Sequence, residues 1–371
     1  MSSTLVSAAG KLLRLLAEPV RRTRSQGPIV IDTYRGYAST EALFLIGRVL
    51  HQPIDHRPGD VSTAASLWQV IRRMRRRGVS GARLTASIDG QRQGLITDRD
   101  GYFSLRMRLR TPLRPHRATA QVHLQLIEPA AAEAFGEVLV APPHCRFMVI
   151  SDIDDTVVAT GVANKTRMIA RMLLKSADSR VAFAGVAEFY RQLHGGLNGH
   201  ENNPLLYVSR GPWVIYETLQ AFFELHRFPG RPVLFLREWG LRFRPPFIRR
   251  DDDHKIEMIN ELLAVSPDLP VVLIGDSGQH DPEMYGDVVK SWPGRVRLVL
   301  IRNVTKAGRD RAVAEIAQAF AAAGPPFVLA ERSAEMAEAA AAAGLIAGSN
   351  ERFAAAAAAT SAPPTAREAR R

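Results

Sequence analysis

The sequence predicts an α/β domain built on a doubly wound parallel sheet, preceded by a smaller β-rich domain. From residue 146 to about 347, short apolar runs alternate with helical stretches, which is the pattern of parallel strands joined by helices. Three of these runs end in a polar cluster, as strands do at the ligand-binding edge of such a sheet. Before residue 146, short alternating runs separated by Asp-Gly turns predict strands without helical connections.

Residues 28–145 are expected to form a β-sandwich of the immunoglobulin-like or transthyretin-like kind. Asp-Gly pairs at 89–90 and 100–101 mark turns at hairpin spacing, and segment 94–103 resembles a turn common in such sandwiches. Strands are expected at 29–34, 42–50, 82–88, 102–109 and 120–126, and an arginine-rich helix at 66–77. This part of the sequence holds no catalytic cluster, so we interpret it as a recognition or scaffold module.

Residues 146–347 are expected to form the parallel α/β domain. Its strands are expected at 147–151, 204–208, 232–236, 270–274, 297–301 and 326–329. The first of these runs is followed directly by the acidic motif Asp152-Ile-Asp-Asp-Thr156. Carboxylates two residues apart can share one hard cation and leave an oxygen free to attack an electrophile. This is the chemistry of phosphoryl transfer through an aspartyl phosphate.

Two other interpretations of the acidic motif have to be weighed. A calcium loop needs further oxygen ligands at regular spacing and a distal glutamate, which residues 157–161 do not supply. A solvated acidic turn is compatible with the motif taken alone. Further motifs along the chain therefore decide the interpretation.

Three such motifs follow in a fixed order. Ser209 ends an apolar run, where its hydroxyl can bind a phosphate oxygen or cap the next helix, with Pro212 expected in that helix's first turn. Lys255 opens a helix after three aspartates and can reach both a carboxylate and a phosphate, although an ordinary surface lysine is the alternative. Asp276 ends a third run, and Asp281 follows five residues later; this indicates a divalent cation or an Asx-capped turn.

In this order, the four motifs resemble those of the haloacid dehalogenase superfamily of aspartate-nucleophile phosphatases. Within the superfamily, the sequences of these motifs are most similar to those of the actin-patch-associated phosphatidate phosphatase family and its bacterial relatives. The matching segments are SDIDDTV at 151–157, YVSRGPW at 207–213, HK at 254–255 and GDSGQHDPE at 275–283. The resemblance covers residues 28–347 and implies a haloacid-dehalogenase-like fold. It also implies magnesium-dependent hydrolysis of a phosphomonoester, with phosphatidate as the substrate of the eukaryotic members.

The resemblance further implies a mechanism. Asp152 attacks phosphorus, and Asp154 protonates the leaving oxygen and later activates water. Thr156 belongs to the phosphate-binding group, where it orients the loop and hydrogen-bonds Asp154. Ser209 holds a phosphate oxygen, and Lys255 offsets the negative charge of nucleophile and phosphate.

The metal site is implied in the same way. Mg²⁺ is held by Asp152, Asp276 and the main-chain carbonyl of Asp154, and Asp281 assists as an outer or water-mediated ligand. Arg210, beside the phosphate-binding serine, is a further candidate for contacting phosphate or substrate.

The spacing of the motifs limits the size of any cap over the site. The gaps are 209 − 152 = 57, 255 − 209 = 46 and 276 − 255 = 21 residues. Once the intervening strand and helices are counted, neither long gap has room for a large cap domain, so we expect a small cap or none. An open site suits a bulky or membrane-resident substrate.

Charge and terminal segments indicate an anionic partner. Lys and Arg exceed Asp and Glu by 49 − 37 = 12. Residues 1–27 are a basic arm that could lie on a membrane as an amphipathic helix, or be a disordered arm or an edge helix. The basic amphipathic stretch 165–175 suits an anionic bilayer, or packs on the core with solvated charges. The Ala-rich tail 348–371 is expected to be disordered.

The sequence also bears on the cellular compartment and on competing functions. Cys145 is the single cysteine, no apolar run approaches the roughly 18 residues of a membrane span, and no signal-peptide pattern is present. We therefore expect a cytoplasmic protein, peripheral to a membrane at most. The alternatives are a phosphatase of nucleotides or phosphoproteins, and a non-catalytic adaptor that binds phosphate or anionic lipid. Nucleic acid is disfavoured because the arginine clusters carry no recognised binding motif.

Overall fold

The computed structural model describes eight stretches of the chain. These are residues 27–52, 77–114, 117–154, 156–157, 183–237, 252–304, 308–321 and 324–348. Four predictions fall on other residues, apart from single positions at their ends: the basic arm 1–27, the helix 66–77, the amphipathic stretch 165–175 and the tail 348–371.

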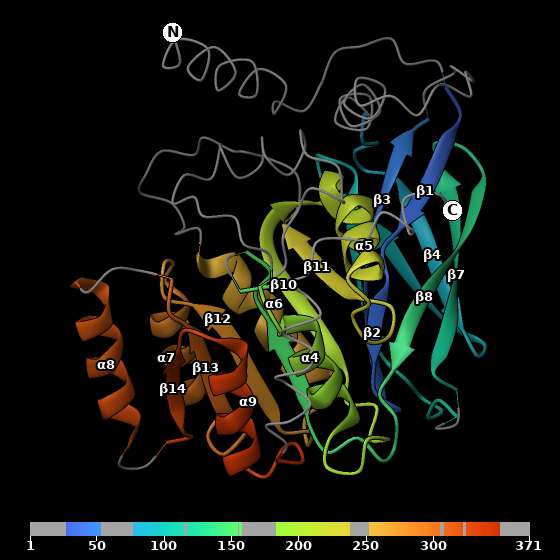
Figure 1. The fold of residues 1–371 in the computed structure, drawn as a ribbon. Helices are drawn as coiled ribbons and strands as arrows, with labels where there is room; N and C mark the ends of the chain where they lie inside the picture. The colour runs from blue at the N-terminus through green and yellow to red at the C-terminus, as the bar shows by residue number, and fades with distance from the viewer. Residues whose placement is uncertain are drawn as a thin grey trace, which may run out of the picture.

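The second half of the chain forms a six-stranded parallel sheet (Figure 1). Its strands are β9 (Met148–Ser151), β10 (Leu205–Pro212), β11 (Val233–Arg237), β12 (Val271–Asp276), β13 (Val296–Arg302) and β14 (Phe327–Ala330). Their order in the sheet is β11-β10-β9-β12-β13-β14, so the direction of strand addition reverses between β9 and β12. The predicted parallel α/β sheet is confirmed, while its assignment to the haloacid-dehalogenase fold stays a prediction.

Helices connect these strands and cover the sheet (Figure 1). They are α4 (Val186–Gly195), α5 (Tyr216–Leu225), α6 (Asp252–Val265), α7 (Asp281–Ser291), α8 (Gly308–Ala321) and α9 (Ser333–Ala342), and a 3₁₀ turn, η2 (Trp213–Ile215), precedes α5. Every residue of β9 and β12 is buried, as expected for central strands of a sheet covered on both faces. Within the described residues, no helix has the length and apolar character needed to span a membrane.

The first half of the chain forms an eight-stranded β domain. Its strands are β1 (Ile29–Thr33), β2 (Gly36–Ala38), β3 (Ala42–His51), β4 (Arg83–Ile88), β5 (Gln91–Ile96), β6 (Tyr102–Arg108), β7 (Thr119–Glu128) and β8 (Ala132–Val140). They follow the order β1-β3-β2-β8-β7-β4-β5, and β6 pairs with β3. Alternate residues of β4 and β7 point into one apolar core. The immunoglobulin-like class of this domain stays a prediction.

Three strands of the β domain were not predicted: β2, β5 and β8. The turn expected over 94–103 is shorter, because β5 continues to Ile96. Strand β8 reads AEAFGEVLV, and its first half is rich in alanine, glutamate and glycine, which are poor strand formers. Gly136 packs closely there, since a Cβ at this position would lie 2.6 Å from Cδ2 of Leu45 and the leucine would have to shift.

The two domains are packed against each other through one continuous apolar core that crosses the predicted boundary at residue 145. The ring of Tyr34 stacks on Trp213 with centroids 3.8 Å apart. The hydroxyl of Tyr37 is 2.8 Å from the hydroxyl of Ser266, directly after α6. The β domain therefore contacts the segment that follows β10 and the far end of α6, two elements that also supply predicted site residues.

Candidate active site

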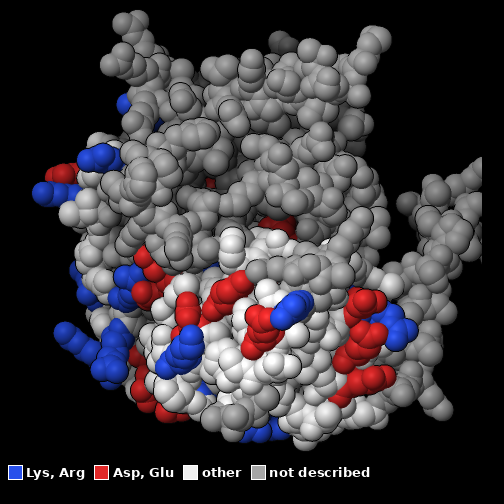
Figure 2. Space-filling view, turned by 90° about the vertical axis from the view of Figure 1, so that its left-hand side faces the viewer, with Lys and Arg blue, Asp and Glu red and all other residues white. Residues whose placement is uncertain are grey.

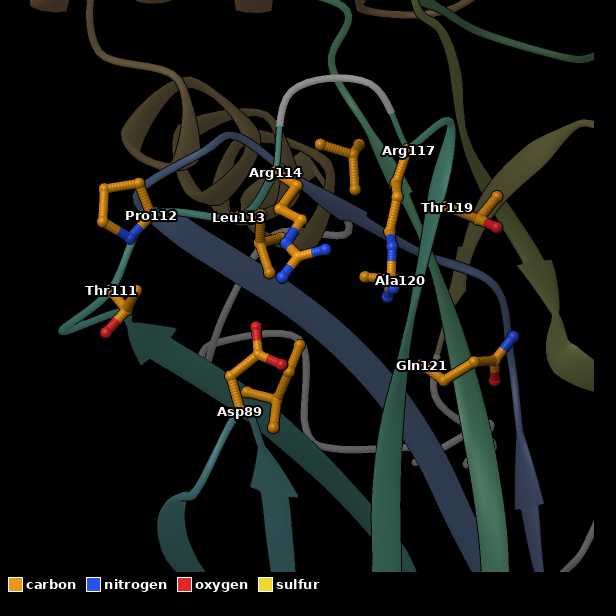
Figure 3. A pocket seen from close by; sticks show the side chains of 11 residues that line it. Asp89, Thr111, Pro112, Leu113, Arg114, Arg117, Thr119, Ala120 and Gln121 are labelled. Carbon is orange, nitrogen blue, oxygen red and sulfur yellow. The ribbon is translucent and has the colours of Figure 1, made fainter.

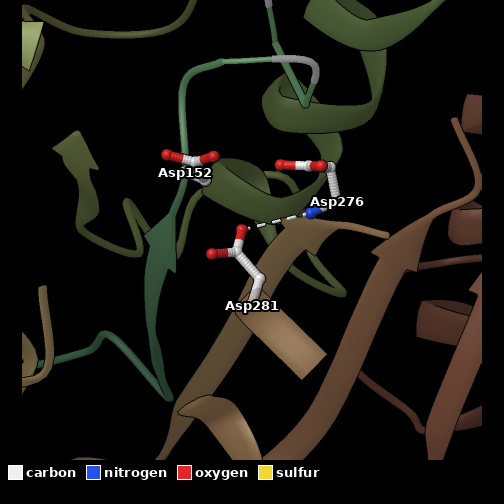
Figure 4. A group of neighbouring side chains, drawn as sticks. All are labelled: Asp152, Asp276 and Asp281. Atoms are coloured by element: carbon white, nitrogen blue, oxygen red, sulfur yellow. Dashed lines mark hydrogen bonds between the residues drawn. The ribbon is translucent and has the colours of Figure 1, made fainter. Parts of the chain in front are cut away.

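The predicted site residues meet at the carboxyl ends of β9 and β12, where the strand order reverses. Asp152 follows the last residue of β9, and Asp276 ends β12, its neighbour in the sheet. Figure 4 shows the carboxyl groups of Asp152, Asp276 and Asp281 converging on one point. Ligands of open α/β sheets bind at such a reversal, because the loops diverge there and leave room.

The site is almost completely buried. No side chain in it is more than 3 % exposed: this holds for Asp152, Asp154, Thr156, Ser209, Lys255, Asp276 and Asp281. Four carboxyl groups thus lie together with one ammonium group among the described residues. Such an excess of buried acid is costly unless protons, metal ions or donors compensate it.

Lys255 contacts two of these carboxylates. Its Nζ lies 3.1 Å from Oδ1 of Asp152 and 2.6 Å from Oδ1 of Asp281. The first turn of α6 carries the lysine into the site. The alternative of an ordinary surface lysine is therefore wrong, because its side chain is buried between two acids.

Asp281 uses both of its carboxylate oxygens within the protein. Oδ1 accepts from Lys255, and Oδ2 accepts the main-chain N–H of Asp276 at 3.2 Å. The approach is close enough to require a glycine, because a Cβ on Gly275 would lie 2.5 Å from Oδ2 of Asp281. Because both oxygens already accept hydrogen bonds, Asp281 is better placed to hold Lys255 and the main chain of Asp276 than to offer a free oxygen to a metal ion.

Asp276 divides its two oxygens between the loop and the site. Oδ1 accepts the main-chain N–H groups of Gly278 and Gln279 at 2.7 and 3.0 Å, which is the Asx-type turn weighed above. Oδ2 accepts the side-chain amide of Gln279 at 3.1 Å. The capping alternative and the site role are therefore compatible, since each uses a different oxygen.

Gln279 is the residue that the sequence reasoning missed. Its Nε2 donates to Oδ2 of Asp276 and lies 3.4 Å from Oδ2 of Asp152, so the amide stands between the two carboxylates. The signal was its position three residues after Asp276, in a Gly-containing loop that must fold back over the strand end.

Ser209 joins Asp154 to the site. Its Oγ donates to Oδ2 of Asp154 at 3.0 Å and accepts the N–H of Gly211 at 2.9 Å. The hydroxyl of Thr156 is buried without a hydrogen-bond partner among the described residues, so the predicted bond to Asp154 is not formed. The side chain of Arg210 lies outside the described part of the structure.

Ser209 lies within strand β10 and does not cap a helix. The strand continues to Pro212, which pairs with Arg237 of β11 after a register shift. The expectation that Pro212 starts a helix is therefore wrong; α5 begins only at Tyr216. Proline is tolerated in a strand where the pairing is irregular, because no ladder bond from its nitrogen is needed there.

The electrostatics of Asp152 reflect this surplus of acid. Burial raises the pKa of the Asp152 carboxyl well above its usual range. Lys255 acts in the opposite direction, and the nearby carboxylates of Asp281, Asp154 and Asp276 raise the pKa further. A cation bound among these acids would lower it again, so ionisation of Asp152 and cation binding favour each other.

The donor set fits a hard divalent cation. Oxygens of Asp152, Asp276 and Asp281 all lie within 4.8 Å of one another. A Mg²⁺ ion with ligands at about 2.1 Å spans oxygens up to about 4.2 Å apart, close to this separation. The set contains carboxylates and neither cysteine nor histidine, which favours Mg²⁺ or Ca²⁺ over Zn²⁺. These three residues could therefore hold a metal ion.

A hollow of about 360 Å³ lies in the β domain (Figure 3). Arg114 and Arg117 project into it from the loop before β7, and Asp89 faces them from the turn after β4. None of the predicted site residues lines this hollow. It is therefore separate from the acid cluster at the end of the parallel sheet.

Comparison with known proteins adds an independent finding. Residues 147–303 match the family described as "Phosphatidate phosphatase APP1, catalytic domain". The phosphatidate phosphatase APP1 of Saccharomyces cerevisiae is 29% identical over 154 residues, which are 42% of this chain and 25% of that protein. An uncharacterised protein of Schizosaccharomyces pombe is 28% identical over 159 residues, with the same shares covered. The chain thus spans about a quarter of the length of these curated relatives.

Among solved structures, a carbohydrate acetylesterase from Xanthomonas citri matches with 10% identity and a TM-score of 0.27. The match covers 83% of this chain and 71% of that one, and at this TM-score it carries no weight. The matched family segment 147–303 contains all the predicted site residues. This segment is therefore similar to the catalytic domains of APP1-like phosphatidate phosphatases, and the similarity supports a phosphatase.

Proposed function

We propose that this chain is a magnesium-dependent phosphatidate phosphatase that works through an aspartyl phosphate on Asp152. The observation that carries the proposal is the contact of Lys255 with Asp152 inside a buried cluster of acids at two strand ends. An ammonium group and a cation site beside one carboxylate are what a nucleophile needs when it attacks a negatively charged phosphate.

The two motif aspartates differ in their surroundings, which supports separate roles. Asp152 has one oxygen beside Lys255 and the other facing Gln279, so these donors act against the burial and the neighbouring acids that raise its pKa, and a bound cation would favour its anionic form further. Asp154 accepts from the neutral hydroxyl of Ser209. A nucleophile must be ionised and a general acid must carry a proton, so we assign these roles to Asp152 and Asp154 respectively.

In the first step, an oxygen of Asp152 attacks phosphorus, and the bond from phosphorus to the leaving oxygen breaks. Asp154 gives its proton to that oxygen, so the leaving group departs as a neutral alcohol. In the second step, Asp154 takes a proton from water as the water oxygen attacks phosphorus. The bond between phosphorus and Asp152 breaks, which restores the carboxylate and releases inorganic phosphate.

Ser209 couples the acid to the phosphate site. While Asp154 is ionised, the serine proton is directed to its Oδ2. When Asp154 is protonated, its carboxyl proton can form the hydrogen bond with Oγ of Ser209. The hydroxyl hydrogen of the serine then becomes available for a phosphate oxygen. The main-chain N–H of Gly211 holds the serine oxygen in place in both states.

Mg²⁺ would be held by Asp152, Asp276 and the main-chain carbonyl of Asp154. When bound, it would supply Lewis-acid stabilisation of the charge on the phosphoryl oxygens. Asp281 is assigned a supporting role, because Lys255 and the N–H of Asp276 already engage its oxygens. Gln279 would have to release at least one of its two carboxylate contacts to admit the ion.

The substrate class follows from the similarity and the charge. The relatives named above include a phosphatidate phosphatase, and the short motif gaps leave no room for a large cap. On the face in Figure 2, described basic and acidic side chains are interspersed. Because segments 1–27 and 165–175 combine basic with apolar residues, we assign contact with an anionic bilayer to them, although they lie outside the described residues, and propose a cytoplasmic, peripheral protein that releases diacylglycerol.

A substrate screen tests this function. Phosphate release from phosphatidate in mixed micelles is compared with release from a nucleotide, a phosphopeptide and a sugar phosphate, with Mg²⁺ or with a chelator. We expect phosphatidate to be preferred, Mg²⁺ to be required and Asp152→Asn to be inactive. The exposed acid variant Asp287→Asn serves as the control and should keep wild-type activity.

Two other results would change the assignment. Preference for a soluble ester would keep the chemistry and reject the lipid. Binding of phosphatidate vesicles without hydrolysis of any ester would instead indicate a non-catalytic adaptor.

A further inference from the structure

The last residue of β13, Arg302, is a buried cation outside the acid cluster. It is 2 % exposed and forms no ion pair with any carboxylate that the structure describes. Burial lowers the pKa of its guanidinium to about 10, which leaves it charged at neutral pH. A buried arginine without an acidic partner is costly, so the groups that it contacts explain its position.

The guanidinium donates to three oxygen atoms and to the sulfur of Met336. Nε donates to the main-chain carbonyl of Thr156 at 3.1 Å, Nη1 to the carbonyl of Glu331 at 3.2 Å, and Nη2 to the hydroxyl of Ser333 at 3.0 Å. Its carbon also lies 4.3 Å from the ring centroid of Phe183, a cation–π distance. The arginine therefore connects three parts of the domain. These are the loop after β9 that carries Asp152, Asp154 and Thr156 (the nucleophile loop), the segment before α4, and the junction of β14 with α9.

This position is next to the candidate active site. Arg302 pairs with Asp276 across β12 and β13, and its carbonyl accepts the N–H of Ser277. Thr156 and Phe183 stand on either side of residues 158–182, which lie outside the described part of the chain. Arg302 thus contacts the chain where it leaves the nucleophile loop and where it returns to the described fold.

The nucleophile loop has main-chain support at both ends. The N–H of Asp152 donates to the carbonyl of Ile274 at 2.8 Å, and the N–H of Val157 donates to the carbonyl of Ile153 at 3.0 Å. The carbonyl of Thr156 is held in addition by a donor from another strand, the Arg302 side chain. We propose that Arg302 is a positioning residue, which holds the loop so that Asp152 and Asp154 face the reacting phosphate; this inference rests on the proposed phosphatase function.

Arg295 offers a matched comparison at the other end of β13. It precedes β13 at the opposite end and also donates to main-chain carbonyls, those of Ser266 and Leu269. It also lies 5.6 Å from the ring of Trp292. The two arginines therefore make the same kinds of contact, one beside the nucleophile loop and the other away from it.

The side-chain chemistry makes the role specific to arginine. A planar guanidinium can serve Thr156, Glu331 and Ser333 at once, whereas an ammonium is a point donor that cannot match this geometry. Arg302→Lys keeps the charge and loses the simultaneous contacts. Arg302→Met keeps bulk and leaves the Thr156 carbonyl without this donor.

The experiment compares Arg302→Lys, Arg302→Met and Arg295→Met with wild type, using a soluble chromogenic aryl phosphate and Mg²⁺. Because misplacement of a reacting group lowers the rate of the chemical step, we expect kcat to fall at least about tenfold in Arg302→Lys and further in Arg302→Met, with KM within about twofold. Arg295→Met should keep kcat within about twofold of wild type.

Hydrogen exchange gives a readout that does not depend on turnover. Peptides covering 148–157 and 183–190 should exchange faster in both Arg302 variants, whereas Arg295→Met should accelerate exchange around 266–269 only. Unchanged kcat and unchanged exchange at 148–157 in Arg302→Lys would overturn the proposal. If wild type hydrolyses no phosphomonoester, the proposed function fails, and the exchange pattern alone still decides whether Arg302 holds the loop.

A third variant covers the case in which both Arg302 variants unfold. Phe183→Leu removes the ring beneath the guanidinium and keeps an apolar side chain of similar bulk. The proposal then requires a lower kcat and faster exchange at 148–157 in Phe183→Leu. Wild-type values for both would overturn it.

Discussion

The two domains use their buried polar groups in different ways. In the β domain, the hydroxyl of Thr97 donates to the carbonyl of Val79 at 2.6 Å and accepts the N–H of Ala82 at 2.9 Å. The buried side chain of Arg48 donates to the carbonyl of Asp100 at 3.0 Å. Each of these groups joins two parts of the β domain, which is what a buried polar group contributes to stability.

In the parallel α/β domain, buried groups of one sign are gathered instead. Asp152, Asp154, Asp276 and Asp281 lie together, and Lys255 contacts two of them. Such a cluster costs folding free energy that a more balanced arrangement would not cost. The comparison teaches that function is found where buried charge is out of balance, and stability where buried polar groups are matched.

The largest effect is expected on turnover when the nucleophile is removed. Asp152→Asn keeps the size of the side chain and removes the attacking oxygen anion, so kcat should fall by about 10⁴-fold or more. Phosphate release under saturating Mg²⁺ measures the change. The exposed variant Asp287→Asn is the control, and equal losses in both variants would contradict the assignment.

The next effect concerns the ammonium group. Lys255→Met leaves Asp152 and Asp281 without their shared cation, so kcat should fall by about 10²–10³-fold. The free energy of unfolding should fall by about 3–5 kcal/mol, because breaking a buried ion pair leaves an uncompensated charge. Urea unfolding measures the second quantity, and Lys290→Met, at an exposed pair, should change neither. Wild-type kcat in Lys255→Met would remove the lysine from the site.

A smaller effect is expected on stability in a chelator. The folded-state pKa of Asp152 lies above its unfolded value, so folding favours the protonated form. The contribution of Asp152 to stability is therefore fully present below the unfolded pKa, at about 3.9, and is lost as pH rises through the folded pKa. Asp152→Asn cannot ionise, so it should have a higher Tm than wild type at pH 8, and the difference should close toward pH 4.

Magnesium provides the internal control for this comparison. Added Mg²⁺ should raise the Tm of wild type at pH 8 and raise that of Asp152→Asn much less, because the variant lacks one charged ligand. Equal Tm shifts in the two proteins would exclude Asp152 as a ligand of the ion.

The smallest effect on activity is expected in the β domain. Thr97→Val removes a hydroxyl with two hydrogen bonds, so the free energy of unfolding should fall by about 1–3 kcal/mol. The kcat of Thr97→Val should equal that of wild type, because the hydroxyl touches only the β domain. A loss of kcat without a loss of stability would show that the division between the domains is incorrect.

The parallel sheet and the central acids could be predicted from the sequence, because three of the six apolar runs end in a functional residue. Asp152 and Asp276 follow from strand ends alone, since parallel strands bring their carboxyl ends to one edge. The contacts of Lys255 depend on how α6 packs, and the sequence could not exclude a surface position. A supporting role for Asp281 was expected from the resemblance, but its contacts with Lys255 and with the Asp276 N–H could not be predicted.

Other features could not be predicted from local patterns. The first half of strand β8 consists mostly of weak strand formers, and the strand is held by pairing with β7 over nearly its whole length. The extension of β10 to Pro212 depends on an irregular register with β11. Arg302 carries no motif, and its importance follows from a contact 146 residues away along the chain, at the Thr156 carbonyl. Such non-local contacts are fixed by the tertiary structure, not by local propensity.

The central claim, a covalent phosphate on Asp152, can be tested by trapping the intermediate. The enzyme is quenched in acid during turnover, reduced with borohydride and digested, so that an acyl phosphate on aspartate is converted to homoserine. We expect homoserine at position 152, in larger amount in Asp154→Asn when the substrate is an aryl phosphate, whose leaving group needs no proton, because this variant cannot activate the water that releases phosphate. Steady turnover with an unmodified Asp152, or homoserine at another aspartate, would contradict the mechanism.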